Sequence, residues 1–392
     1  WAGNRQAVAV WLSREGNVAP IVERLCSKTL LSPEVRGAIQ EWVMNQLVEE
    51  IDKVVTLETG SAETELSAAL ARNGVLPMFG FPSRVRNLWD VPIKSRSWLR
   101  DRVVADRALD MAIVSFAPEA EVVKDGLLHQ VAGFAAYKVK GHVVESVDPL
   151  GTPKDLGRCP SCGRSELGKA ERCAACDSEV ESLKVFEPRG FRTTYRARAF
   201  DDDSDVPASV STPALTVGAE PTEHHDLPCL DLDLYSQSRL VTVNDNFGRG
   251  YSFQPQQDGT VIAEPGLAGG LAQQVIGEVR VTDALLITPS RLDVPTGAIS
   301  INDQASGRAA YVSLAEVLRR GAQVFLDLDP AELSVGLTPV RLPMFSSNEG
   351  DIKAQVAAAI YLADTAENGA GYAVELGQKE IFEAMMKQTY AD

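Results

Sequence analysis

The chain has 392 residues, of which 45% are hydrophobic and 23% charged. This composition is typical of a folded protein with about two or three domains, and it excludes a mostly disordered, collagen-like or disulfide-scaffolded chain. The apolar runs, such as Val131–Tyr137 and Val356–Leu362, are too short to span a membrane, which takes about 20 residues. No secretion signal is present either, and we expect a cytoplasmic protein with no membrane partner.

The formal net charge of −16 is unevenly distributed. Residues 1–200 sum to +1 and residues 201–392 to −17. A protein that coats nucleic acid by bulk electrostatics needs a basic face, so any contact with a polyanion is expected in the first half. Because the chain opens with Trp1 instead of Met, we expect a mature product, a fragment or a part of a longer protein.

Residues 1–74 are predicted to form a helical subdomain. Ser32 and Pro33 supply an N-cap and a first-turn proline, and apolar residues from Val35 to Val54 then recur every three or four positions. This pattern predicts one helix of about five turns. A second run of helix formers ends at Asn73-Gly74, a typical C-terminal cap.

Residues 75–200 are predicted to form a mixed α/β domain. Between Pro77 and Arg107 the chain carries seven basic residues against three acidic ones. Strands are expected at Asp110–Phe116 and Gln130–Lys138, where β-branched and aromatic residues gather.

Residues 201–226 contain the acidic run Asp201–Asp203 and no periodicity, which predicts a linker or surface loop. Residues 227–392 are then predicted to form a C-terminal α/β domain, giving an α+β protein overall. A hairpin is expected around residues 244–248, and a helix from Ser313 to Arg320 is expected to stop at Gly321, before a strand at Gln323–Leu328.

Four cysteines carry the clearest chemical signal, because two C-x2-C pairs are separated by ten residues: Cys159, Cys162, Cys173 and Cys176. This spacing is typical of a zinc ribbon, at about residues 157–180, in which four thiolates surround one structural zinc ion. Gly163 supplies the permissive backbone that a tight turn after the first pair needs. Two disulfides or a redox-active pair are the alternatives.

No catalytic motif for phosphate binding, dinucleotide binding, serine hydrolysis or zinc proteolysis is present. The carboxylates of Asp327, Asp329, Asp364 and Glu367 could pair for acid–base chemistry or bind Mg²⁺, although acidic residues after strands are usually solvated. The chain as given therefore does not look like an enzyme.

Several phrases of the sequence, in this order, are similar to one family. They are Leu76–Arg86, Ala112–Glu119, the two cysteine pairs, Glu187–Phe191, Val281–Leu285, Tyr361–Asp364 and Asn368–Tyr372. Together they resemble the region after the motor domains of large bacterial DEAD/DEAH-box (superfamily 2) helicases, which ends in the MrfA-type zinc-binding domain. The likeness covers roughly residues 65–380 and is strongest to helicases and partner proteins of DISARM-type anti-phage defence systems.

Two departures limit what the resemblance implies. The family's terminal domain continues into a second cysteine cluster, which this sequence lacks, and the chain contains no helicase ATPase motif. The resemblance therefore implies a motor located in the same polypeptide or in another one. ATP and Mg²⁺ would act only through that motor.

Under this resemblance the basic segment is expected to contact DNA that is single-stranded or unwound. Arginine side chains neutralise phosphates, and aromatic rings stack on unpaired bases. The expected contacts are Arg84, Arg86, Arg96, Arg100, Arg102, Phe79 and Phe81. In the alternative interpretation the arginines pair with Asp90, Asp101 and Asp106 or with the acidic second half of the chain, and the aromatic residues belong to the core.

Three hypotheses follow. The preferred one is a helicase-associated accessory region that supports or guides DNA for an ATP-dependent motor, in anti-phage defence. The alternative is a structural adaptor subunit that binds only protein partners. The third is a metal-dependent hydrolase that uses the C-terminal carboxylates.

Overall fold

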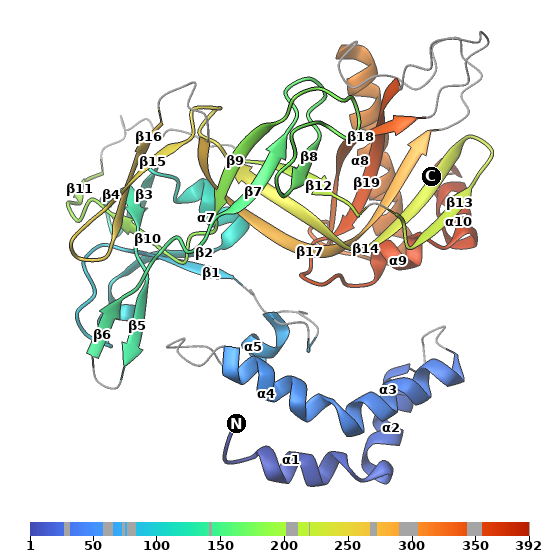
Figure 1. Ribbon diagram of the computed structural model, residues 1–392, viewed down its shortest axis with the longest axis horizontal. Coiled ribbons are helices and arrows are strands. Elements are labelled where there is room, and N and C mark those ends of the chain that lie inside the picture. Colours follow the sequence, from blue (N-terminus) through green and yellow to red (C-terminus); the bar gives the residue numbers. More distant parts are fainter. Residues whose placement is uncertain are drawn as a thin grey trace. The chain divides into compact units, whose positions relative to one another are not determined.

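The computed structural model describes residues 1–26, 32–57, 66–72, 75–76, 84–140, 143–200, 211–218, 220–266, 273–289, 305–342 and 355–391 (Figure 1). The chain divides into two compact units, Trp1–Ser83 and Arg84–Asp392. The first unit is helical and the second contains all the described strands, which confirms the predicted α+β class.

The first unit consists of α1 (Arg5–Leu12), α2 (Glu15–Cys26), α3 (Pro33–Asn45), α4 (Leu47–Leu57) and α5 (Leu66–Arg72). The Ser32 side chain accepts a hydrogen bond from the backbone of Val35, as an N-cap should. The single helix predicted over Val35–Val54 is wrong, because α3 ends at Asn45 and α4 begins at Leu47. Since α3 packs mainly on α2 and α4 also contacts α5, the break lets the two halves of the apolar stripe face different neighbours.

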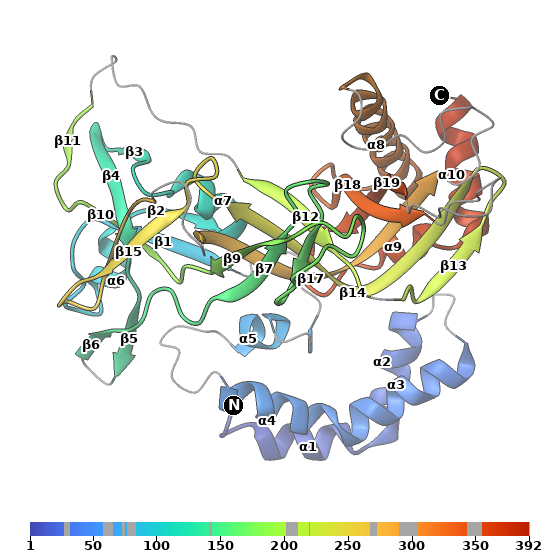
Figure 2. The ribbon, with the colours of Figure 1, turned by 45° about the horizontal axis from the view of Figure 1, so that its top comes forward.

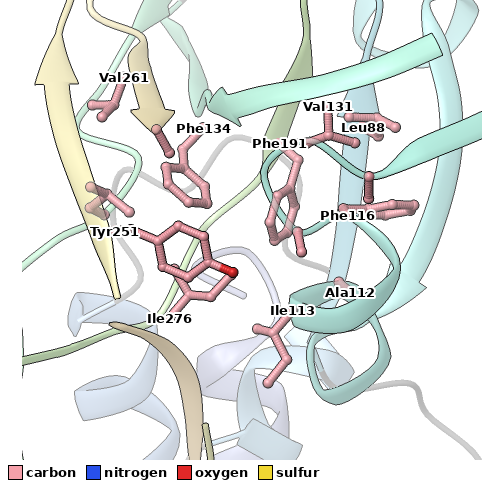
Figure 3. Packing of buried hydrophobic residues seen from close by; sticks show 14 of the residues in the cluster. Leu88, Ala112, Ile113, Phe116, Val131, Phe134, Phe191, Tyr251, Val261 and Ile276 are labelled. Atoms are coloured by element: carbon pink, nitrogen blue, oxygen red, sulfur yellow. The ribbon is translucent and has the colours of Figure 1, made fainter. Parts of the chain in front are cut away.

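The second unit begins with a group of short strands around an aromatic core. These are β1 (Val85–Trp89), β2 (Val103–Ala108), β3 (Glu121–Lys124), β4 (Leu127–Phe134), β10 (Phe191–Thr193) and β11 (Arg198–Ala199), with the separate hairpin β5 (Tyr137–Lys140) and β6 (Val143–Ser146). Phe191 packs between Phe134 and Phe116, with ring centroids 5.5 Å apart in each pair (Figure 3). Two short helices, α6 (Trp98–Asp101) and α7 (Leu109–Ser115), complete this part.

The strand predicted at Asp110–Phe116 is wrong, because this segment is helix α7 and its cap. Its buried residues are Leu109, Ala112, Ile113 and Phe116, which recur at helical spacing and face the aromatic core. The β-branched residues of the segment favour a strand locally, but burial of this helical face decides the structure.

Two long strands of the second unit pair with each other and with several shorter strands. β14 (Leu230–Asn244) and β17 (Gln273–Pro289) pair antiparallel along most of their length, with a bulge between Tyr235 and Ser238. β17 also pairs with β19 (Gln355–Asp364), which pairs with β18 (Leu333–Leu342). On the other side, β12 (Thr212–Thr216) and β13 (Glu223–Asp226) pair with β14.

The segment predicted as a linker at residues 201–226 therefore contains two strands, β12 and β13. Leu215 is buried where β12 pairs with β14, which explains how a segment without periodicity becomes part of the sheet. The acidic run Asp201–Asp203 lies outside the described residues.

The hairpin predicted around residues 244–248 is also wrong. β15 (Tyr251–Pro255) pairs with β16 (Val261–Pro265) and, at Tyr251, with β17, but not with β14. Buried Asn244 explains the departure, because its amide donates to the carbonyl of Ile113 at 2.7 Å and its oxygen accepts from the Tyr251 hydroxyl.

Three helices cover one side of the C-terminal strands: α8 (Ala305–Leu326), α9 (Tyr372–Leu376) and α10 (Lys379–Ala391) (Figures 1 and 2). The predicted helix stop at Gly321 and the strand at Gln323–Leu328 are wrong, because α8 continues to Leu326. A Cβ atom at Gly321 would lie 2.1 Å from the hydroxyl oxygen of Thr389 in α10. This glycine therefore permits close packing of α8 on α10 instead of ending the helix.

The predicted zinc ribbon belongs to the second unit and pairs with the start of β17. Its strands are β7 (Lys154–Arg158), β8 (Ser165–Leu167) and β9 (Glu181–Phe186). β7 pairs with both β8 and β9, and β9 pairs in parallel with the start of β17. Strands of the two predicted α/β domains belong to the same hydrogen-bonded sheet, and the boundaries at residues 200 and 227 stay predictions.

Candidate metal centre and basic surface

The four predicted cysteines lie together in two turns of matching geometry. In the first turn the backbone N–H of Gly163 donates to the carbonyl of Cys159 at 2.9 Å, and in the second Asp177 donates to Cys173 at 2.8 Å. Gly163 and Asp177 both adopt positive φ, at 81° and 61°. The expectation that Gly163 supplies a permissive turn is confirmed, and Asp177 fills the same place at the cost of an unusual backbone conformation.

The four sulfur atoms are placed as ligands of one ion. They lie within 4.8 Å of one another, and the sulfurs of Cys159 and Cys176 are 3.4 Å apart. A tetrahedral zinc ion with Zn–S bonds of about 2.3 Å separates its sulfur ligands by about 3.8 Å. All four cysteines are unpaired, so disulfides are not formed, and the cluster could hold a metal ion such as zinc.

The surroundings of the thiols differ. Burial raises the pKa of Cys162 well above its ordinary range and also raises that of Cys173. Burial would raise the pKa of Cys176 as well, but hydrogen bonds from Ser178 outweigh it and lower the pKa to about 6. Because a metal binds thiolates, a bound cation would have to displace protons from the buried thiols. Four sulfur ligands leave no open position for water, so the site suits a structural role.

The cysteine cluster is packed against the C-terminal strands. Val180 and Val356, which belongs to β19, pack on the cysteines. Arg164, directly after the first turn, donates from Nη1 to the carbonyl of Pro339 in β18 at 2.9 Å. Metal binding at this position would therefore fix the ribbon against β18 and β19.

Arg84 is the first predicted DNA-binding residue, and it lies in a buried network of acidic groups. Its guanidinium makes a two-point contact with Glu367, with Nε 3.2 Å from Oε2, and Nη1 lies 3.1 Å from Glu187. Glu278 is a third acidic neighbour. Burial disfavours the charged arginine, but Glu367 and the other two carboxylates outweigh burial and raise the pKa of Arg84.

This network shows which carboxylates surround Arg84. Two of its partners, Glu278 and Glu367, belong to the acidic second half of the chain, as the alternative interpretation expected, and the third, Glu187, belongs to the first half. Sequence reasoning singled out none of these three carboxylates as a partner of Arg84, although Glu187 opens one of the phrases on which the family resemblance rests. Lys154 bonds Glu187 and lowers its pKa despite burial, so this carboxylate is held in its charged form.

Two other predicted arginines also have partners. Arg86 donates from Nε to the carbonyl of Pro188 at 2.6 Å. Arg102 forms an ion pair with Asp90 at 3.1 Å, and its side chain is 43% exposed. Phe79 and Phe81 lie outside the described residues.

Arg96 and Arg100 differ from the rest. Both are exposed, and neither forms an ion pair with a residue that the structure describes. They lie in residues 94–102, here called the basic turn, which also contains Lys94 and Trp98. The Trp98 ring is 38% exposed between the two arginines in sequence.

Buried side chains anchor the basic turn to the rest of the second unit. Ile93 and Leu99 are buried in a cluster with Trp89. The Trp89 indole donates to the carbonyl of Leu99 at 3.3 Å and packs edge-on against Tyr137 at 5.1 Å. The turn therefore presents its cations from a packed support, which reduces the entropy lost when they bind a ligand.

Three of the four carboxylates considered for hydrolysis make other contacts: Asp364, Glu367 and Asp329. Asp364 is fully buried and accepts three backbone hydrogen bonds, from Ala370 at 2.6 Å, Gly371 at 2.8 Å and Ala373 at 2.9 Å. Burial outweighs these bonds and raises the pKa of Asp364. The family phrase Asn368–Tyr372 is therefore a loop fastened to the end of β19.

Glu367 pairs with Arg84, and Asp329 accepts from the backbone of Ala331 in an exposed turn. No described acidic groups gather as a metal site: among the described residues the cysteines form the one such cluster. The third hypothesis, a metal-dependent hydrolase, receives no support from this arrangement.

The other cysteines and histidines that the structure describes are separate from the cysteine cluster. Cys26 is buried in the first unit, and Cys229 is exposed. His224 bonds Asp233 across two strands at 2.7 Å. His129 is mostly buried, which lowers its pKa.

No helix in the described residues is both long and apolar enough to cross a membrane. No family model and no curated protein matches the sequence. Among solved structures, the chain is similar to one described as "Crystal Structure of DUF1998 helicase MrfA bound to DNA", with a TM-score of 0.38 and 11% sequence identity. The match covers 88% of this chain and 38% of that one, so the chain spans well under half the length of that helicase.

Proposed function

We propose that this chain is a helicase-associated accessory region that guides single-stranded or unwound DNA for an ATP-dependent superfamily 2 motor. The motor lies in the same or another polypeptide and supplies the ATP and Mg²⁺ chemistry. The sequence phrases shared with such helicases support this function, as does the four-cysteine centre expected in that family. The same resemblance supports a cytoplasmic role in anti-phage defence of the DISARM type.

The observation that carries the proposal is the basic turn. Arg96 and Arg100 are exposed without described ion-pair partners, and Trp98, between them in sequence, is 38% exposed. Two cations beside an aromatic ring match the recurring elements of a nucleic-acid strand, a phosphate backbone and a base. Arg102 has an exposed, weak ion pair that phosphate could replace.

Arg84 takes a different role in this proposal. Because its charge is already matched by buried carboxylates, it stabilises the start of the second unit and does not contact DNA. Arg86 keeps its bond to the Pro188 carbonyl. The candidate contacts are therefore Arg96, Arg100 and Arg102.

The proposal is tested by binding of a labelled oligo(dT) strand to the whole chain across a salt series. For the double variant Arg96→Glu/Arg100→Glu we expect affinity at low salt to fall about tenfold or more. The slope of log K against log salt should shrink by about 0.7 for each phosphate that the variant no longer neutralises. The matched control is Lys379→Glu/Lys387→Glu, which makes the same charge change on α10.

Equal affinity and salt slope in the two double variants would reject the DNA contact. A motor that binds DNA equally well with and without this chain would favour the structural adaptor instead.

A further inference from the structure

A groove of about 510 Å³ lies within the second unit, apart from the basic turn. Its walls are the ends of the ribbon strands, β12, helix α8 and the middle of β18. β12 lies beside both β18 and the ribbon strand β8 (Figures 1 and 2). The metal centre borders the groove through Cys162 and Gly163 but does not fill it.

One wall of the groove is an open sheet edge. In the part of the chain that the structure describes, β18 pairs with β19 only. In an antiparallel pair, successive residues direct their N–H and C=O groups alternately toward the partner strand and away from it. Pro339 has no N–H for a bond to β19, so it is one of the residues of β18 that face away from β19. Its carbonyl accepts from Arg164, which approaches from outside the pair.

By this alternation, Val335 and Leu337 also direct their N–H and C=O groups away from β19. No described backbone group bonds them. An unpaired edge of this kind is a template for another extended chain. Val335, Gly336 and Leu337 all line the groove.

A buried hydroxyl without a partner lies at the same edge. Tyr361 of β19 stands opposite Gly336 of β18, and a Cβ atom at Gly336 would lie 2.5 Å from the Tyr361 hydroxyl oxygen. The ring therefore crosses over the glycine and brings the hydroxyl to the open side of β18, where Tyr361 lines the groove.

The Tyr361 side chain is 1% exposed, and no described group makes a hydrogen bond of ordinary geometry with its oxygen. Burial raises the pKa of Tyr361 to about 12, and the nearby Ser334 hydroxyl only partly opposes this shift. A buried hydroxyl without a partner costs about 1–3 kcal/mol. A ligand with an acceptor at this position would remove that cost.

The remaining walls select the chemistry of the ligand. Leu215, Leu337, Val312 and Ala315 give apolar surface, and Val312 is 46% exposed. Arg158 is neutralised by Asp245 at 2.6 Å. Arg308 is exposed, without an ion pair to any described residue, so the groove offers one available positive charge.

We infer that this groove binds an extended, acidic segment of a partner protein, which adds a strand to the open edge of β18. Its main chain bonds Val335 and Leu337, an apolar side chain occupies the space between β12 and α8, and a carboxylate pairs with Arg308. An acceptor of the segment bonds the Tyr361 hydroxyl. A nucleic-acid strand fits less well, because it lacks the repeating N–H donors that the edge carbonyls need and meets only one available cation.

The first test is hydrogen exchange of the whole chain without any partner. An open edge predicts that the outward amides of Val335 and Leu337 exchange much faster than the inward amides of β18. Slow exchange of both in the chain alone would overturn the inference, because the edge would then already be covered.

The second test uses linear peptides selected from a phage-displayed random library on the whole chain. We expect enriched peptides with alternating apolar and acidic residues that slow exchange at Val335 and Leu337. A selection that yields no such peptide, or slowing by an oligo(dT) strand instead, would overturn the inference.

Two variants, each with a matched control, then report on the binding mode of the selected peptide. Leu337→Pro removes one outward donor and should weaken binding about fivefold beyond Leu337→Ala, since a hydrogen bond contributes about 1 kcal/mol. Arg308→Glu should weaken binding, whereas the control Lys387→Glu on α10 should not.

Because a proline at position 337 can also disturb the folding of β18, Tyr361→Phe provides an independent test. It removes only the unpaired oxygen, so the unbound protein should be at least as stable as before while peptide affinity falls several-fold. Unchanged affinity in both Tyr361→Phe and Leu337→Pro would show that the peptide binds elsewhere.

Discussion

Arg84 and Glu367 are separated by 283 residues in the sequence, and their side chains meet in a two-point ion pair inside the second unit. The Arg84 side chain is 19% exposed and that of Glu367 is 8% exposed. The pair joins the first residue of this unit to the loop after β19. Glu187 and Glu278 complete its surroundings, so a single cation holds three acids together.

Loss of this cation should destabilise the second unit strongly. We expect Arg84→Met to lower the free energy of unfolding by about 3 kcal/mol, because removing one partner leaves buried charges uncompensated. Urea denaturation followed by circular dichroism measures the effect. The matched control is Arg102→Met, which removes an exposed pair and should cost at most about 1 kcal/mol. Similar losses in the two variants would contradict the buried network.

The cysteine centre should bind one zinc ion per chain. We expect elemental analysis of the purified protein to give this ratio, and Cys162→Ser to lose the metal because three thiolates no longer close the site. Chelation of the metal should then speed hydrogen exchange in the ribbon and in the β18 and β19 segments that pack on it. Cys229→Ser is the control, since this exposed cysteine lies outside the cluster. Full zinc content in Cys162→Ser would refute the assignment.

Asp364 should stabilise the loop that carries the family phrase. In Asp364→Asn one acceptor oxygen becomes a donor that faces backbone N–H groups, so we expect a loss of about 2 kcal/mol in the free energy of unfolding. Hydrogen exchange at Gly371 and Ala373 should accelerate. Asp329→Asn makes the same change in an exposed turn and should have little effect. Unaltered exchange in Asp364→Asn would mean that these bonds do not hold the loop.

His224 should titrate above its ordinary pKa. The hydrogen bond to Asp233 favours the protonated ring and raises the pKa of His224 above 6.5. Its contribution to stability is therefore fully present below pH 6.5 and is lost as the pH rises through the higher folded value. Histidine-selective NMR should show this pKa fall towards 6.5 in Asp233→Asn. If the pKa does not move, the pair does not form in solution.

The cysteine centre could be predicted from the sequence because its information is local. All four ligands lie within one short segment, and the spacing of each C-x2-C pair already determines a turn that directs two sulfurs to one side. The same holds for the Ser32 cap, whose partner is three residues away. Such features depend on neighbouring residues alone, and distant parts of the chain add little to them.

Other predictions failed where packing outweighed local preference. Ile113 and Val114 favour a strand, yet the burial of one helical face in the aromatic core makes this segment a helix. Gly321 is a typical helix stop, but here it makes room for Thr389 of α10. In both cases the deciding contact comes from residues far away in the chain.

The sequence alone therefore determined the α+β class, the four cysteines that cluster and the location of the basic segment. Only the tertiary structure decided which arginines of that segment have carboxylate partners, because the three carboxylates around Arg84 lie more than 100 residues away along the chain. It also decided that, among the described residues, β18 pairs along one edge with β19 and with no strand along the other, since the pairing of a strand depends on every other strand of its sheet. Ion pairs and sheet edges depend on which residues lie close together in space, and separation along the chain does not determine this.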